Sequence, residues 1–147
     1  MSTSKVKYIG GLRTEAVHSA SGNTIITDAP VDNHGKGEAF SPTDLLCTSL
    51  ASCMLTLMGI AADTQNLRVN EGGKRLTIDG ATIEVTKIMA ANPRRVGAID
   101  LIIRMPRNDY TAKEMQILEN AAKTCPVALS IHPSIKLTLE FFYPSQG

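Results

Sequence analysis

The most restrictive feature of the sequence is a long apolar segment between Ser41 and Asp63. Ser41 can cap a helix there, Pro42 suits the first helical turn, and Asp44 completes an S-x-x-D capping box. Apolar side chains fall on nearly all sides of this predicted helix: Leu45, Leu46, Leu50, Met54, Leu55, Leu57, Met58 and Ile60. A helix that is apolar all round is typical of a protein core. We therefore expect a central buried helix with Cys53 in its middle.

The segments before and after this helix carry strand, turn and further helix patterns. The first 30 residues alternate polar and apolar around a turn at 21–23, which predicts a hairpin, and residues 29–40 predict a surface loop. Runs rich in β-branched residues predict three later strands, over 74–90, 95–106 and 135–143. Helices are expected over 109–125, where Thr111 and Glu114 form a second capping box, and over 126–132. This order predicts an α+β sandwich.

Length and composition indicate one ordinary globular domain, which we expect to span residues 1–147. Hydrophobic residues make up 43% and charged residues 20% of the chain, and the formal net charge is +1, so there is no basic excess to attract nucleic acid or anionic lipid. We find no segment approaching the roughly 18 apolar residues of a membrane helix, and no signal-peptide core at the N-terminus. We therefore expect a cytoplasmic protein with neither a nucleic-acid nor a membrane partner.

The three cysteines are the candidate reactive residues. Their odd number and the lack of a C-x-x-C pair argue against a disulfide framework and against a zinc site. Cys53 lies too far into its helix for the helix dipole to activate it, whereas Cys125 precedes Pro126, where free N–H groups would favour a thiolate. Cys47 lies about 120° from Cys53 around the helix, so we interpret it as a packing residue. For Cys53 and Cys125, burial as small hydrophobic residues and chemical reactivity both stay open.

Two motifs carry a resemblance to a known family. The apolar helix that holds Cys53 opens with FSPTDLL, and Cys125 stands in the pattern A-x-x-x-C-P-V after a helix. With the order of the strands, these motifs resemble the OsmC/Ohr family of osmotically inducible and organic hydroperoxide resistance proteins. The resemblance implies an intertwined homodimer, with antiparallel strands around central buried helices and active sites at the subunit interface. It also implies a thiol peroxidase that needs no metal or other cofactor.

The resemblance also implies a role for individual residues. Cys53 corresponds to the cysteine that attacks the peroxide, and Cys125 corresponds to the cysteine that resolves the sulfenic acid as a disulfide. The resemblance implies that an external dithiol of the lipoyl type, or another thiol, then reduces this disulfide. Arg13, in GGLRTEA, is the best match for the family arginine that stabilises the thiolate.

The family glutamate that holds this arginine is missing, because its position ten residues before the cysteine is Thr43 here. Asp44 is nine residues before Cys53, which places it on the opposite side of the helix from Cys53. The presence of Asp44 is therefore better explained by helix capping than by a role beside Cys53. Glu38 in the preceding loop is the remaining candidate to orient Arg13.

The sequence as a whole favours a thiol-dependent peroxidase that reduces organic hydroperoxides in oxidative stress defence. Two alternatives stay open. One is a binding protein for small molecules or acyl chains that keeps the fold without catalysis, which the missing glutamate favours. The other is a thiol redox sensor, which the same cysteine pair would serve.

Overall fold

The structure, a computed structural model, describes residues 1–64, 67, 73 and 75–144. The protein has the predicted α+β composition, and its chain divides into two compact units, Met1–Leu46 and Cys47–Gly147. Each unit contains a three-stranded sheet. A single helix, α1 (Pro42–Thr64), begins in the first unit and continues into the second.

The first unit is built on an antiparallel sheet in the order β1-β2-β3, formed by Ser4–Gly10, Arg13–His18 and Thr24–Asp28. The predicted hairpin is confirmed: Gly22 and Asn23 lie in the turn, where the Gly22 N–H donates to the His18 carbonyl at 2.8 Å. The third strand, β1, was not predicted. It is joined to β2 through Gly10 and Gly11, whose φ angles of +93° and +62° lie in the region that glycine adopts most readily.

One face of this sheet carries an apolar cross-strand row. Val6 pairs with Ala16, and Ala16 pairs with Ile25, so the three side chains point to the same side. Val6 is 62% exposed and Ile25 is 51% exposed. The short 3-10 helix η1 (Val31–Asn33) and the loop to Ser41 follow β3 without burying this row.

The long helix α1 forms with the predicted bounds but buries only one stripe. Its buried residues recur at helical spacing: Cys47, Leu50, Ala51, Met54, Met58 and Ala62. Leu46 and Ile60 are exposed, the latter by 50%, so the expected burial on all sides is wrong for the isolated chain. Among the described residues α1 is also the one helix long and apolar enough to cross a membrane, with a mean hydropathy of 1.9. This corrects the expectation that no such segment exists, although core helices of soluble proteins share the property.

The second unit contains a mixed sheet in the order β4-β5-β6, formed by Thr82–Ala90, Arg95–Arg104 and Lys136–Phe142. β4 and β5 pair antiparallel through the predicted turn, but β5 and β6 pair parallel. The expectation of antiparallel strands throughout is therefore wrong. The reason is that the connection between β5 and β6 includes two helices, which is long enough to bring β6 back in the same direction.

β4 is shorter than predicted. The expected strand over 74–90 begins only at Thr82, because Asp79 and Gly80 form a turn in which Gly80 has a φ of +91°. Lys74, the first residue of that expected strand, lies outside the described residues.

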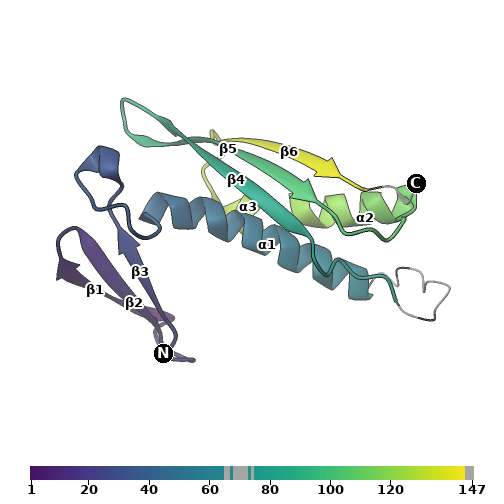
Figure 1. Ribbon diagram of the computed structural model, residues 1–147, viewed down its shortest axis with the longest axis horizontal. Helices are drawn as coiled ribbons and strands as arrows, with labels where there is room; N and C mark the ends of the chain where they lie inside the picture. The colour runs from purple at the N-terminus through teal and green to yellow at the C-terminus, as the bar shows by residue number, and fades with distance from the viewer. Residues whose placement is uncertain (65–66, 68–72, 74, 145–147) are drawn as a thin grey trace. The chain divides into compact units, whose positions relative to one another are not determined.

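The helices of this unit cover one face of the sheet (Figure 1). α2 (Ala112–Lys123) begins with the predicted capping box, in which Thr111 and Glu114 exchange hydrogen bonds of 2.8 and 3.1 Å. α3 (Pro126–Ser130) follows directly. Their side chains, with those of α1 and β5, form one core whose largest fully buried members include Leu50, Met54, Met58, Ile99, Leu101, Ile103 and Leu118.

Candidate active site

The structure brings Cys53 and Cys125 together. Cys53 lies in the middle of α1 and is partly buried, while Cys125 lies between α2 and α3 and is fully buried. Cys53 lies close enough to Cys125 to act on the pKa of its thiol, and both sulfurs are free thiols. A partly buried thiol close to a fully buried one is an arrangement that can pass from dithiol to disulfide.

Cys125 is positioned by the helix that follows it. It is the N-cap residue of α3, with Pro126 at the first helical position, and its Sγ accepts the backbone N–H of Ala128 at 3.4 Å. Burial nevertheless raises the pKa of the Cys125 thiol, and the neighbouring Cys53 raises it further, although the Ala128 N–H acts in the opposite direction. The N–H groups of this short helix favour the thiolate, as the sequence suggested, but the loss of hydration outweighs them.

Cys47 has the packing position that its spacing predicted. It is buried in the core stripe of α1, about 120° around the helix from Cys53.

Arg13 is held by two carboxylates within the first unit. Its Nε–H donates to Asp28 Oδ1 at 2.7 Å, and its Nη2–H groups donate to Asp28 Oδ2 at 2.8 Å and Glu38 Oε2 at 3.0 Å. The Arg13 hydrogen bond holds the pKa of Asp28 below its ordinary value, although burial of the carboxylate acts against this. Asp28 and Glu38 in turn raise the pKa of the guanidinium. Arg13 and Glu38 are thus in contact, as the sequence suggested for this pair.

The two remaining predicted residues serve the start of α1. Asp44 Oδ2 accepts the Ser41 N–H at 2.9 Å, and the Asp44 N–H donates to Ser41 Oγ at 3.1 Å, which is the predicted capping box. The Thr43 hydroxyl lies 3.2 Å from the hydroxyl of Ser41. Neither residue is among the hydrogen-bond partners of Arg13 in the described part of the chain.

Asp28 is the contact that sequence reasoning missed. Arg13 and Asp28 are paired across β2 and β3, so the register of the predicted hairpin already contained the signal. Counting outward from the turn near Gly22 places an arginine opposite an aspartate, and opposite charges on directly paired strand residues attract each other.

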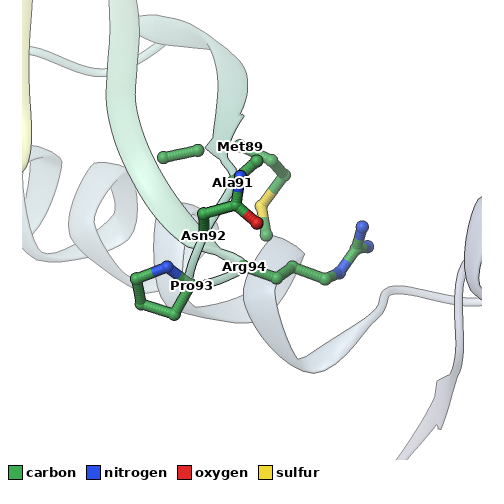
Figure 2. A pocket seen from close by; sticks show the side chains of 6 residues that line it. Met89, Ala91, Asn92, Pro93 and Arg94 are labelled. Carbon is green, nitrogen blue, oxygen red and sulfur yellow. The ribbon is translucent and has the colours of Figure 1, made fainter.

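A hollow of about 370 Å³ lies at the turn between β4 and β5 (Figure 2). It is lined by the six consecutive residues from Met89 to Arg94. No cysteine lines it, so it does not contain the candidate thiol chemistry. Within residues 1–64, 67, 73 and 75–144, no group of three or more His, Cys, Asp or Glu side chains is placed to hold a metal ion.

Comparison with known proteins identifies the family. The family model described as OsmC-like protein matches residues 35–140, which is most of the chain and includes both thiols of the pair. The chain belongs to the OsmC-like family. Among curated proteins, no match to this OsmC-like protein was found.

Solved structures agree with this membership. The OsmC-like chain is 54% identical to a protein of Psychrobacter arcticus 273-4, which is described as a candidate osmotic stress induced and detoxification response protein. The TM-score is 0.87, and the alignment covers 97% of this chain and 96% of that chain. An organic hydroperoxide resistance protein OsmC from Legionella pneumophila shares the fold at 15% identity, with a TM-score of 0.69 and coverage of 96% and 97%.

A candidate organic hydroperoxide resistance protein from Vibrio cholerae, solved with captopril bound in one of the active sites, also has this fold. Its TM-score is 0.68 at 13% identity, and the alignment covers 96% of this chain and 92% of that chain.

Proposed function

We propose that this OsmC-like protein is a thiol peroxidase that reduces organic hydroperoxides through Cys53 and Cys125. The observation that carries the proposal is the proximity of Cys53 and Cys125, two free thiols that lie close enough for the first to act on the pKa of the second. Membership of the family, and structural neighbours named organic hydroperoxide resistance proteins, support the choice of substrate.

In the first step, the Cys53 thiolate attacks an oxygen of the hydroperoxide and the O–O bond breaks. The sulfur is oxidised to a sulfenic acid, and the other oxygen leaves as an alkoxide that takes up a proton to become an alcohol. Cys53 suits this step better than Cys125, because Cys53 is partly exposed whereas Cys125 is buried and its pKa is raised.

In the second step, the Cys125 sulfur attacks the sulfenic acid, a disulfide forms, and the Cys125 proton and the hydroxyl leave as water. An external dithiol, lipoyl-type or another thiol, then reduces the disulfide and becomes oxidised itself. A protonated Cys125 fits this order of events, since it keeps the second thiol from competing for the peroxide. The proposal places the cycle in the reducing cytoplasm, where such thiols are regenerated.

Arg13 is proposed as the cation that stabilises the Cys53 thiolate, in the role that the family arginine has. A guanidinium stays charged at every physiological pH, and the two carboxylates on Arg13 raise its pKa further. Asp44 and Thr43 are assigned to the start of α1 rather than to this chemistry.

The protein is further proposed to act as a homodimer. The Val6 and Ile25 side chains on the first sheet, and Ile60 on α1, are each at least half exposed in the single chain. Apolar surface of this kind is typical of a face that a partner covers. A second copy of the chain is the partner that the family membership favours.

The experiment that tests the function is a turnover assay with tert-butyl hydroperoxide and dihydrolipoamide, at fixed protein concentration. Wild-type protein and Cys47→Ser should consume many equivalents of hydroperoxide, whereas Cys53→Ser should consume none above background. Dithiothreitol is tested as a second reductant. Oxidation of the wild-type Cys53 and Cys125 thiols without repeated turnover with either reductant would favour the redox sensor. Thiols that survive excess hydroperoxide would favour the binding protein.

A further inference from the structure

We infer that Asp28 is the positioning residue for Arg13, in the place of the helix glutamate that this chain replaces with Thr43. The inference concerns how the arginine is held, and its effect on catalysis rests on the proposed peroxidase function. No position of the chain other than Asp28 combines a direct strand pairing with Arg13 and a two-point contact to its guanidinium among the described residues.

The contact between Arg13 and Asp28 fixes the plane of the guanidinium. Two parallel N–H···O bonds, from Nε to Oδ1 and from Nη2 to Oδ2, form the bidentate arrangement that a carboxylate makes with arginine. One hydrogen bond leaves a side chain free to rotate about it, whereas two do not. The Asp28 carboxylate therefore sets both the place and the orientation of Arg13.

The Asp28 carboxylate is itself held firmly. Its side chain is 0% exposed, and the backbone N–H of Glu38 donates to Oδ2 at 3.0 Å. Its own backbone N–H donates to the Phe40 carbonyl at 3.0 Å, which ties the end of β3 to the loop before α1. A carboxylate fixed at both its backbone and its oxygens can position a longer side chain that is not fixed.

Glu38 contributes less to the orientation of Arg13. Its side chain is 66% exposed and meets Arg13 at the single atom Nη2. Exposed ion pairs of this kind are weak because water screens them. Glu38 therefore adds negative charge beside Arg13 without fixing its plane.

The arrangement leaves one edge of the guanidinium open. In the described part of the chain, the hydrogen bonds of Arg13 occupy Nε and Nη2, and none is formed by Nη1. Nη1 carries two N–H donors on the edge away from Asp28. Asp28 thus determines which donors of Arg13 are available to a thiolate or a peroxide oxygen.

The roles of Asp28 and Glu38 predict opposite effects of removing their charges. If Asp28 acted only by neutralising Arg13, Asp28→Asn would leave more positive charge for the thiolate and would speed the reaction. If Asp28 positions Arg13, the same change slows the reaction despite that gain in charge. Glu38→Gln removes an equal charge while the bidentate contact stays in place, so it is the matched comparison.

The test measures the second-order rate constant for the reaction of reduced Cys53 with tert-butyl hydroperoxide. The rate constant is measured at intervals between about pH 5 and 9, a range that brackets thiol titration. Asp28→Asn is expected to react about 10- to 100-fold more slowly than Glu38→Gln, since misplacing a catalytic group by about 1 Å has an effect of that order. The rate constant of Asp28→Glu is expected to lie between those of Asp28→Asn and Glu38→Gln. Glu15→Gln, on the same strand as Arg13, controls for a charge change elsewhere. An Asp28→Asn rate equal to or above that of Glu38→Gln would overturn the inference.

A second measurement does not depend on catalysis or on the stability of a variant. In wild-type protein labelled with ¹⁵N-arginine, the Arg13 Nε–H should exchange with solvent at least about tenfold more slowly than the Nε–H of Arg104, which contacts Glu84 through Nη2 instead. Equal exchange would contradict a fixed Arg13–Asp28 contact. Slow exchange in a protein that does not react with hydroperoxide would retain the contact and reject the proposed function.

Discussion

Cys53, in the middle of α1, lies close enough to Cys125, the N-cap residue of α3, to act on the pKa of its thiol. The two side chains differ in environment, since Cys53 is partly exposed and Cys125 is buried. This difference gives each thiol a separate expected behaviour, and it leads directly to the first two predictions.

One equivalent of organic hydroperoxide should convert the Cys53 and Cys125 thiols into a disulfide and leave Cys47 reduced. The physical reason is that Cys125 already lies close to Cys53, whereas Cys47 lies elsewhere on α1. Mass spectrometry should show a loss of about 2 Da, as formation of one disulfide requires. Cys125→Ser should instead accumulate sulfenic acid at Cys53 or overoxidise. A disulfide or sulfenic acid at Cys47 would argue against this assignment.

Alkylation of the reduced protein should reach Cys53 before Cys125 at neutral pH. Because burial raises the pKa of Cys125, its thiolate should appear only above the ordinary cysteine value of about 8.5. The measurement is the rate of iodoacetamide labelling of each cysteine-containing peptide from pH 6 to about 10.5, repeated in urea as the unfolded reference. The Cys125 midpoint should fall toward its ordinary value in urea. A folded-state midpoint below that value would contradict the prediction.

Acid should weaken the folded state through Asp28. The pKa of Asp28 is lowered in the folded chain, so the unfolded chain binds more protons between the two pKa values. The contribution of Asp28 to stability is therefore present above the ordinary value of about 3.9 and is lost as the pH falls through the lowered pKa. Urea unfolding at fixed protein concentration should show wild type more stable than Asp28→Asn at pH 7, with the gap closing in acid.

Glu140→Gln, which removes an exposed carboxylate on β6, is the control for that experiment. Its unfolding free energy should follow that of wild type across the whole pH range. A gap between wild type and Asp28→Asn that widens in acid would show that the sign of the Asp28 contribution is wrong.

The protein should sediment as a dimer at micromolar concentration. In Val6→Asp/Ile25→Asp, carboxylates replace two exposed apolar side chains of one cross-strand row. Burying an uncompensated carboxylate costs more than about 1.4 kcal/mol, so the dissociation constant should rise by more than about tenfold. Lys5→Asp changes the opposite face of β1 and serves as the control. A wild-type monomer in analytical ultracentrifugation would reject the dimer.

Much of the local structure could be predicted from the sequence. The starts of α1 and α2 follow from the capping residues Ser41 and Asp44, and Thr111 and Glu114, whose hydrogen bonds span one helical turn. The hairpin near Gly22 was also predictable from turn residues. Such features depend on residues within a few positions of one another, so the chain encodes them wherever it folds.

The sequence by itself thus determined the helices, the hairpin and, through short motifs, the family. Only the tertiary structure decided that β6 runs parallel to β5, that the Asp28 carboxylate meets the Arg13 guanidinium at two points, and that burial raises the pKa of Cys125. The physical reason is that strand direction, bidentate contacts and loss of hydration depend on which distant segments pack together. Local patterns placed Cys53 and Cys125 on their helices, and long-range packing placed one thiol against the other.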